Sequence, residues 1–170
     1  MKDDIRNADI LVIINPTKKF SGKDVSSVRE YLDKGGKVLL MDSAANGNST
    51  SNELLSAFGM KIDRNRKGVL PSMYSTPWMI RLAQNSSFAV EGGVTLVKSN
   101  EGEPVFSSLR TGKGMIAVMG FSQLFTNPQM GGSYRVKPND AQRKIYDLEF
   151  NILKGLAAGD MGNYFRVEVR

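Results

Sequence analysis

The sequence predicts a three-layer α/β sandwich with a mainly parallel sheet and an antiparallel hairpin extension. Two segments are typical of strands that are covered on both faces, as in a parallel sheet: the unbroken apolar run of residues 10–14, and residues 37–41, where Lys37 precedes four apolar residues. A helical pattern between these runs completes a β-α-β unit. From residue 88 the pattern changes to short strands, and the glycine-containing turn at residues 110–114 indicates a hairpin. Because 170 residues is the size of one domain, we expect a single domain over residues 1–170.

The helix of the first β-α-β unit has recognisable signals at both ends. Ser21 and Asp24 have the spacing of a capping box, which predicts that the helix begins after Ser21. Gly35-Gly36 ends the helix, because glycine readily adopts the left-handed conformation that follows many helices. The chain then enters the second buried strand, so residues 10–14 and 37–41 are expected to lie side by side.

A polar loop, residues 42–52, is expected to follow the second strand, because this stretch has no large apolar residue. Thr50 and Glu53 have the spacing of a second capping box, which predicts a short helix that ends at Gly59. The pattern beyond this helix predicts a short strand at 60–63, a basic turn region at 64–71 and a short helix at 76–82.

Short strands and one long helix dominate the second half of the chain. We expect a long polar connection over residues 121–139, and then a helix that begins near Asn139 or Asp140 and ends at Gly159. An extra C-terminal strand is expected within residues 160–170, where apolar and polar side chains alternate. The strands that precede the connection are predicted at residues 88–90, 94–98, 105–109 and 115–119.

The composition contains no cysteine and no histidine. Their absence excludes Cys–His and Ser–His–Asp catalysis, disulfides, Cys/His zinc sites and haem ligation by these residues. Any catalysis would depend on carboxylates, lysine, tyrosine, serine or threonine, or on a hard metal held by oxygen ligands. The sequence shows no catalytic set of this kind, no metal-ligand spacing and no cofactor motif.

The formal net charge is +6, which favours contact with anionic partners. The basic residues are spread thinly and are not interleaved with aromatic side chains, so a nucleic acid is not the expected partner. The longest aliphatic run, residues 10–14, is too short to span a membrane, and the polar segment 1–9 does not resemble a signal peptide. We expect a soluble domain, either cytoplasmic or exported within a larger membrane-attached protein.

Four stretches of the chain carry a resemblance to a known family. They are ADILVIINPTKKFS, GGKVLLMDSAANGNSTSNELLSAFGMKI, GKGMIAVMGFSQLFTN and YDLEFNILKGL. Together they resemble the glutamine amidotransferase-like superfamily and, more narrowly, its non-catalytic branch, the GIFT-like domains, over roughly residues 8–158. The resemblance implies a Rossmann-like or flavodoxin-like fold. It also implies a binding or assembly role, as in accessory proteins of intraflagellar transport, oligosaccharyltransferase and gliding-motility transporters.

The resemblance also implies that this chain is not an amidotransferase. Catalytic members carry a cysteine after the strand that matches residues 37–41, and Asp42 occupies that position here, with Ser43 beside it. The family's His–Pro–Glu region matches residues 120–123, which contain no histidine. The nucleophile and the base are both missing, so the resemblance favours a non-enzymatic binding or assembly module, in a membrane-associated or transport complex.

The family's fold begins with a strand and a helix before the first apolar run, whereas this sequence reaches that run after nine residues. If the first unit is absent, the sheet has an exposed edge that needs covering. The segment 164–170 or a second chain would cover it. A protein partner or a homo-oligomer is therefore expected.

Candidate ligand-binding residues lie where the parallel strands end, because open α/β sheets bind ligands beyond the carboxyl ends of their strands. Asp42 has two interpretations: it ligates Mg²⁺ or a sugar hydroxyl, or it caps its own loop through an Asx turn. The lysines after the first strand either bind an anion at a helix N-terminus or are simply exposed. An alternative function is therefore a small-ligand binder, for an anion or a sugar, or a carboxylate-based, metal-assisted enzyme. The candidates are Asn15, Thr17, Lys18, Lys19, Ser21, Asp42, Ser43 and Ser122.

Overall fold

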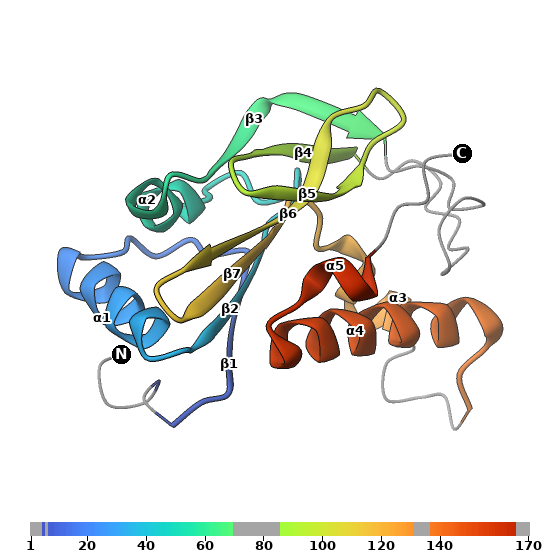
Figure 1. Cartoon of the computed structure of the whole chain (residues 1–170). Coiled ribbons are helices and arrows are strands. Elements are labelled where there is room, and N and C mark those ends of the chain that lie inside the picture. The colour runs from blue at the N-terminus through green and yellow to red at the C-terminus, as the bar shows by residue number, and fades with distance from the viewer. Residues whose placement is uncertain (1–4, 6, 70–85, 131–136, 166–170) are drawn as a thin grey trace.

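The protein folds as two β-sheets with helices against both faces of the larger sheet (Figure 1). A computed structural model describes residues 5, 7–69, 86–130 and 137–165. The strands are β1 Ile10–Ile14, β2 Lys37–Met41, β3 Lys61–Val69, β4 Ser86–Glu91, β5 Val94–Lys98, β6 Pro104–Thr111 and β7 Gly114–Met119. The main sheet has the order β1-β2-β7-β6-β5, and β3 pairs with β4 in a second sheet.

The helices flank the main sheet and create an apolar core on each face. Helix α1 packs on β2 and β7, and helix α4 packs on β1 and β2. The side chains of β2 alternate between these cores: Val38 and Leu40 lie in the α1 core, and Leu39 and Met41 lie in the α4 core. The helices are α1 Gly22–Asp33, α2 Ser51–Leu55, α3 Asn127–Met130, α4 Asp140–Ala158 and α5 Met161–Tyr164, with 3-10 turns η1 Ser56–Phe58 and η3 Gln123–Phe125.

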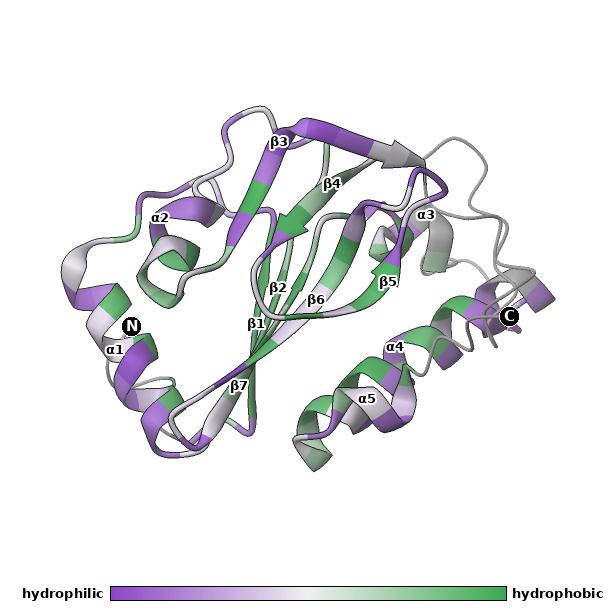
Figure 2. Cartoon of the chain, turned by 45° about the horizontal axis from the view of Figure 1, so that its top comes forward, coloured by the Kyte–Doolittle hydropathy of each residue, from purple (hydrophilic) through white to green (hydrophobic). Residues whose placement is uncertain are grey.

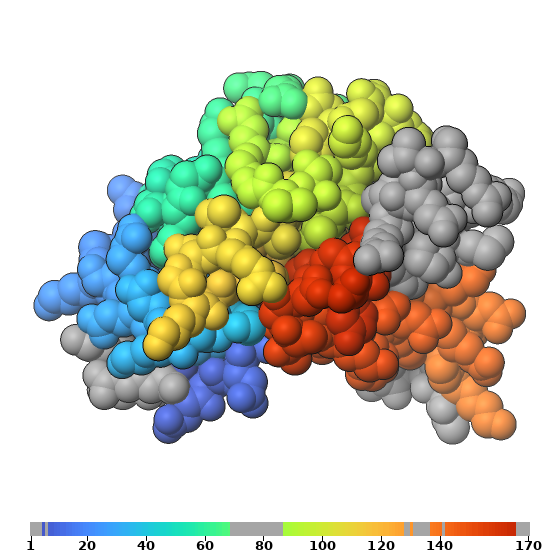
Figure 3. Space-filling model, viewed as in Figure 1, coloured from blue at the N-terminus to red at the C-terminus, as the bar shows by residue number. Residues whose placement is uncertain are grey.

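The predicted β-α-β unit and hairpin are both confirmed. β1, β2 and β7 are parallel neighbours, and β6 and β5 add to β7 in antiparallel orientation. The hairpin between β6 and β7 closes at the pair Thr111 and Gly114, with Gly112 at φ 57° in the left-handed region. In the space-filling view this hairpin (yellow) lies between the α1 side of the molecule and α5 (Figure 3). The sheet is therefore mixed, with its parallel part confined to three strands.

The basic stretch after residue 63 differs from its prediction. Residues 64–69 continue strand β3 and do not form a turn, and an irregularity between Asp63 and Lys67 interrupts their pairing with β4. Much of β3 is hydrophilic (Figure 2), so the side chains of this segment do not predict a strand. Residues 64–69 are nevertheless a strand, because the distant strand β4 supplies their backbone partners. Arg66 of β3 also forms ion pairs with Glu91 and Glu103. The helix predicted at 76–82 lies outside the described residues.

The C-terminal part confirms the predicted long helix but not the strand expected after it. Asn139 and Gln142 form a capping box at the start of α4, and Gly159 ends the helix at φ 65°. Beyond it, residues 161–164 form the short helix α5, so this part of the predicted 160–170 strand is wrong. Residues 166–170 lie outside the described part of the chain.

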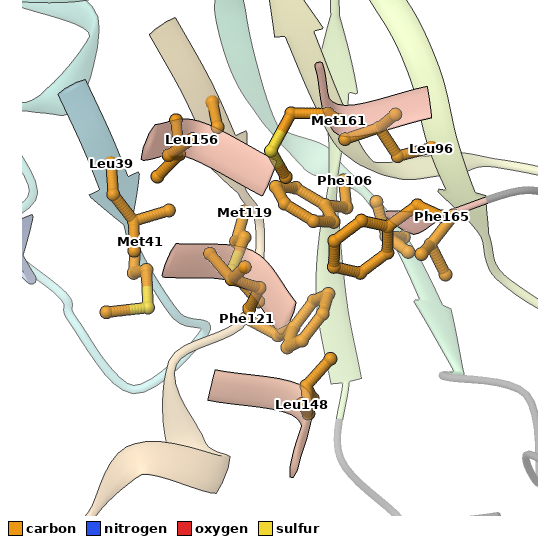
Figure 4. Packing of buried hydrophobic residues seen from close by; sticks show 14 of the residues in the cluster. Leu39, Met41, Leu96, Phe106, Met119, Phe121, Leu148, Leu156, Met161 and Phe165 are labelled. Carbon is orange, nitrogen blue, oxygen red and sulfur yellow. The ribbon is translucent and has the colours of Figure 1, made fainter. Parts of the chain in front are cut away.

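Burial of two apolar side chains explains why the chain turns helical after Gly159. Met161 and Phe165 enter the α4 core, where the ring of Phe165 meets the ring of Phe106 edge-on at 5.1 Å between centroids (Figure 4). The start of α5 borders the cavity beside Val94 and Arg110 on β5 and β6, at the opposite border of the sheet from β1. The described part of the 164–170 segment therefore does not cover β1.

Candidate functional site

The carboxyl ends of β1, β2 and β7 bring three loops together. The backbone N–H of Asn15 donates to the Met41 carbonyl at 2.8 Å, and the N–H of Asp42 donates to the Met119 carbonyl at 3.0 Å. The Ser122 hydroxyl donates to Oδ1 of Asn15 at 2.9 Å. Asn15 has φ 45°, a left-handed conformation that asparagine tolerates better than most residues. Four of the candidate residues, Asn15, Asp42, Ser43 and Ser122, thus lie at one edge of the sheet, where the topology predicts a site.

The Asp42 carboxylate is almost completely buried, with 1% of the residue exposed. Its Oδ1 accepts hydrogen bonds from the Ser43 N–H at 2.8 Å and from Nδ2 of Asn46 at 2.9 Å. Its Oδ2 accepts from the hydroxyls of Ser49 and Ser51. Both oxygens are therefore occupied by the chain's own loop, which is the local capping role that was one of the two interpretations of Asp42.

The two serines of the site are also enclosed. Ser43 and Ser122 are each 2% exposed. The Ser122 hydroxyl points to the amide oxygen of Asn15, and its backbone N–H donates to Oε1 of Gln123 at 3.1 Å. An amide oxygen does not remove a proton from a hydroxyl as a catalytic base does. The contacts of Ser122 hold the ends of β1 and β7 together.

The lysine-containing loop after β1 is occupied by carboxylates from within the chain. The Phe20 N–H donates to Oε2 of Glu53 at 2.9 Å, and the Ser21 N–H donates to Oδ2 of Asp24 at 3.0 Å. An anion at these N–H groups would displace a carboxylate or meet its charge. Thr17, Lys18 and Lys19 are exposed. The structure does not bring these three side chains, or Ser21, to the Asp42 network.

The same contacts show why the capping box predicted at Thr50 and Glu53 is wrong. The Thr50 side chain makes no cap bond in α2; its hydroxyl donates to the Lys18 carbonyl at 2.8 Å. Glu53 reaches the backbone of Phe20 on the same loop. Both side chains therefore fasten the loop after β1 to α2.

The capping box at Ser21 and Asp24 gives a pH-dependent prediction. Hydrogen bonds from the Ser21 side chain, and then from its backbone, lower the pKa of Asp24 below its ordinary value. A lowered pKa stabilises the fold above the unfolded-state pKa, and this contribution disappears as the pH falls through the folded-state pKa. We expect Asp24→Asn to lower the thermal midpoint at neutral pH and to match the wild type in strong acid.

Thermal unfolding followed by circular dichroism across the acid range measures this difference. The Ser21→Ala variant is the matched control: in its background, Asp24→Asn should have a smaller effect, because the two side chains act as a pair. A difference between wild type and Asp24→Asn that stays constant with pH would contradict the prediction.

Three side chains that complete the site were not predicted from the sequence. Ser49 and Ser51 bind Asp42, and Glu53 binds the loop after β1. The available signal was the density of small polar residues in the stretch that follows Asp42, which is the composition of a loop that hydrogen-bonds to itself. Among the described residues, no group of three or more acidic side chains is arranged to hold a metal ion.

The N-terminal part of the chain matches one protein-family model. Residues 1–78 match the family model of the IFT52 GIFT domain. The matched stretch contains β1, α1, β2 and the Asp42 loop, but not β7 and Ser122, which complete the candidate site. No curated protein sequence matches the chain.

Solved structures show that the fold is shared with the same domain. The structure of the "mmIFT52 N-terminal domain" is similar with a TM-score of 0.63 at 18% identity, covering 90% of this chain and 80% of that one. The exo-β-1,4-mannosidase Op5Man5 from Opitutaceae bacterium strain TAV5 is similar with a TM-score of 0.49 at 14% identity, covering 82% of this chain and 24% of that one. The GH42 β-galactosidase Gan42B has the same TM-score at 13% identity, covering 90% of this chain and 22% of that one. The likeness to the IFT52 N-terminal domain, which extends over most of both chains, shows that the two share a fold. None of the described helices has the length and apolar character that crossing a membrane requires.

Proposed function

We propose that this chain is a non-catalytic binding or assembly module of the GIFT type and that it works within a transport complex. The match to the IFT52 GIFT domain and the shared fold with the IFT52 N-terminal domain support the role. A glutamine amidotransferase-like ancestry with a three-layer Rossmann-like sandwich is the finer form of the proposal. It agrees with a parallel β1-β2-β7 core that has helices on both faces.

The proposal rests mainly on the burial and the hydrogen bonding of the Asp42 carboxylate. Acyl transfer from glutamine needs an accessible nucleophile with a neighbouring base. At this strand end the chain has a buried carboxylate with hydrogen bonds to both oxygens, and beside it a serine bonded to an amide oxygen. The strand ends are used to hold loops in place, which favours a module that presents a fixed outer surface to a protein partner.

The experiment is a glutaminase and esterase assay on the purified chain, with Ser122→Ala as the test variant and Ser26→Ala, on the exposed face of α1, as its matched control. We expect background rates for the wild type and for both variants. Turnover that Ser122→Ala abolishes and Ser26→Ala preserves would contradict the proposal.

The small-ligand or metal-assisted alternative requires Asp42 to exchange its internal donors for a ligand. A thermal-shift panel of divalent metals, sugars, nucleotides and phosphate tests this alternative directly, because a ligand that binds only the folded state raises the unfolding temperature. We expect no shift across the panel. A shift that is lost in Asp42→Asn would favour the alternative.

A further inference from the structure

The loop after β2 contains an asparagine that is followed by a glycine, Asn46-Gly47. Asparagine is a chemically labile residue, because the backbone nitrogen of the next residue can attack its side-chain amide. Glycine in that next position has no side chain to obstruct the attack. No other asparagine of the sequence precedes a glycine, so Asn46 has the most reactive neighbour of them all.

The folded loop holds both reacting groups in hydrogen bonds. Nδ2 of Asn46, the leaving nitrogen, donates to Oδ1 of Asp42 at 2.9 Å and to the Pro16 carbonyl at 3.2 Å. The backbone N–H of Gly47, the attacking group, donates to the Ala45 carbonyl at 3.1 Å. Attack requires the Gly47 nitrogen to lose its proton and turn toward Asn46, and departure requires Nδ2 to gain a proton while it donates two bonds. The closed loop therefore opposes both steps.

We propose that Asn46 is a deamidation site controlled by the Asp42 network: it is unreactive in the closed loop and is converted when the loop opens. In the open loop, the deprotonated Gly47 nitrogen bonds to Cγ of Asn46. The Cγ–Nδ2 bond then breaks, and Nδ2 takes up a proton and leaves as ammonia. Water opens the resulting succinimide at one of its two carbonyl groups, which gives aspartate or isoaspartate. The net reaction is hydrolysis of an amide to a carboxylate and ammonium, and water is its sole co-reactant.

The product does not fit the closed loop. Aspartate at position 46 replaces a donor with a carboxylate oxygen at a place that lies 2.9 Å from Oδ1 of Asp42, and isoaspartate also lengthens the backbone. Two carboxylates at this distance repel each other, and water screens the repulsion little because Asp42 is 1% exposed. The bond to the Pro16 carbonyl, which joins the loops after β1 and β2, is lost as well. Deamidation therefore makes a transient opening of the loop permanent.

The first test compares the folded chain with a synthetic peptide of residues 42–52, by mass spectrometry at constant pH and temperature. We expect Asn46 to be converted at least about tenfold more slowly in the folded chain, because the rate follows the population of the opened loop. In denaturing urea the chain should react as fast as the peptide. Gly47→Ala, whose Cβ atom meets nothing within 4 Å, is the chemical control and should slow the reaction in urea. A folded chain that reacts as fast as the peptide, or an unfolded chain that is not converted at Asn46, would overturn the proposal.

The second test separates control by the Asp42 network from general protection by the fold. We expect Asp42→Ala to accelerate conversion of Asn46 at least about tenfold, because the loop opens more often without the carboxylate. If circular dichroism shows that this variant is unfolded, Asp42→Asn takes its place and should give a smaller acceleration. Leu156→Ala, which leaves a cavity in the α4 core, is the matched control and should leave the rate at Asn46 nearly unchanged. Equal acceleration by the Leu156 and Asp42 variants would overturn the control by the network.

The third test examines the product through Asn46→Asp. We expect this variant to exchange amide hydrogens faster in the loops after β1 and β2 than the wild type does. Its thermal midpoint should fall further than that of Asn46→Ala, which removes the same two hydrogen bonds without adding a charge. Asn48→Asp adds the same charge at an exposed position of the same loop and should behave as the wild type does. An Asn46→Asp variant as stable and as protected as the wild type would overturn the proposed opening by the product.

Discussion

Replacement of Asp42 by alanine should lower the free energy of unfolding by about 3–5 kcal/mol, comparable to breaking a buried ionic pair. The carboxylate accepts hydrogen bonds from the backbone of Ser43 and from the side chains of Asn46, Ser49 and Ser51. Removing it leaves these donors without a partner in an enclosed loop, and each unsatisfied buried group is costly. Urea unfolding followed by fluorescence of the single tryptophan measures the change.

Asp42→Asn is the informative companion variant. An asparagine side chain keeps one accepting oxygen for Ser43 and Asn46, and the hydroxyls of Ser49 and Ser51 can rotate to accept from its Nδ2. We expect a smaller loss, about 1–2 kcal/mol. Asp33→Ala, which removes an exposed carboxylate, is the control and should have little effect. If Asp42→Ala were as stable as the wild type, the network would not support the fold, and Asp42 would be available to a ligand.

Gly120→Ala should destabilise the protein by about 3 kcal/mol or more, because the new methyl group has no space. A Cβ atom at this position would stand 2.0 Å from the carbonyl oxygen of Phe88. The new Cβ atom is fixed to the backbone of residue 120, and the atoms that it meets belong to the backbone of Phe88. A change of side-chain rotamer therefore cannot relieve the clash. The Phe88 N–H donates to the Gly120 carbonyl at 2.8 Å, and the Gly120 N–H donates to the Val105 carbonyl at 2.9 Å, so both segments are held in place.

The thermal midpoint of Gly120→Ala should fall by roughly 6–12 °C, as that free energy implies for a chain of this length. Gly47→Ala is the control, because a Cβ atom there meets nothing within 4 Å. An equal effect of the two substitutions would show that general backbone stiffening, and not the clash with Phe88, is responsible. Gly120 directly follows β7 and is bonded to Phe88 of β4, so this position supports the joint between the two strands.

Elements with strong local signals could be predicted from the sequence. The apolar run at residues 38–41 indicated a strand buried on both faces, and its side chains do alternate between two cores. Ser21 with Asp24 and Asn139 at the start of α4 marked helix starts that the structure confirms. In these cases the residues that decide the structure lie within one helical turn or one strand of each other.

Local sequence patterns gave wrong predictions where the residues bond to a partner that is distant in the sequence. Thr50 and Glu53 have capping-box spacing like Ser21 and Asp24, yet they bind the loop at residues 18–20. Residues 64–69 are polar and basic, yet they form a strand because β4 provides the backbone partners. Neither partner is a sequence neighbour, so local propensity carried no information about them.

The sequence by itself determined that thiol and imidazole chemistry are absent and that a carboxylate, Asp42, follows the second buried strand. Those facts depend only on which residues are present and on a short apolar run. The tertiary structure decided that Asp42 is enclosed by Asn46, Ser49 and Ser51, and that β1 is the outermost of the described strands on its side of the main sheet. Both outcomes depend on which surfaces meet after the chain folds, and the neighbours that satisfy a buried charge or leave an edge unpaired are set by long-range packing.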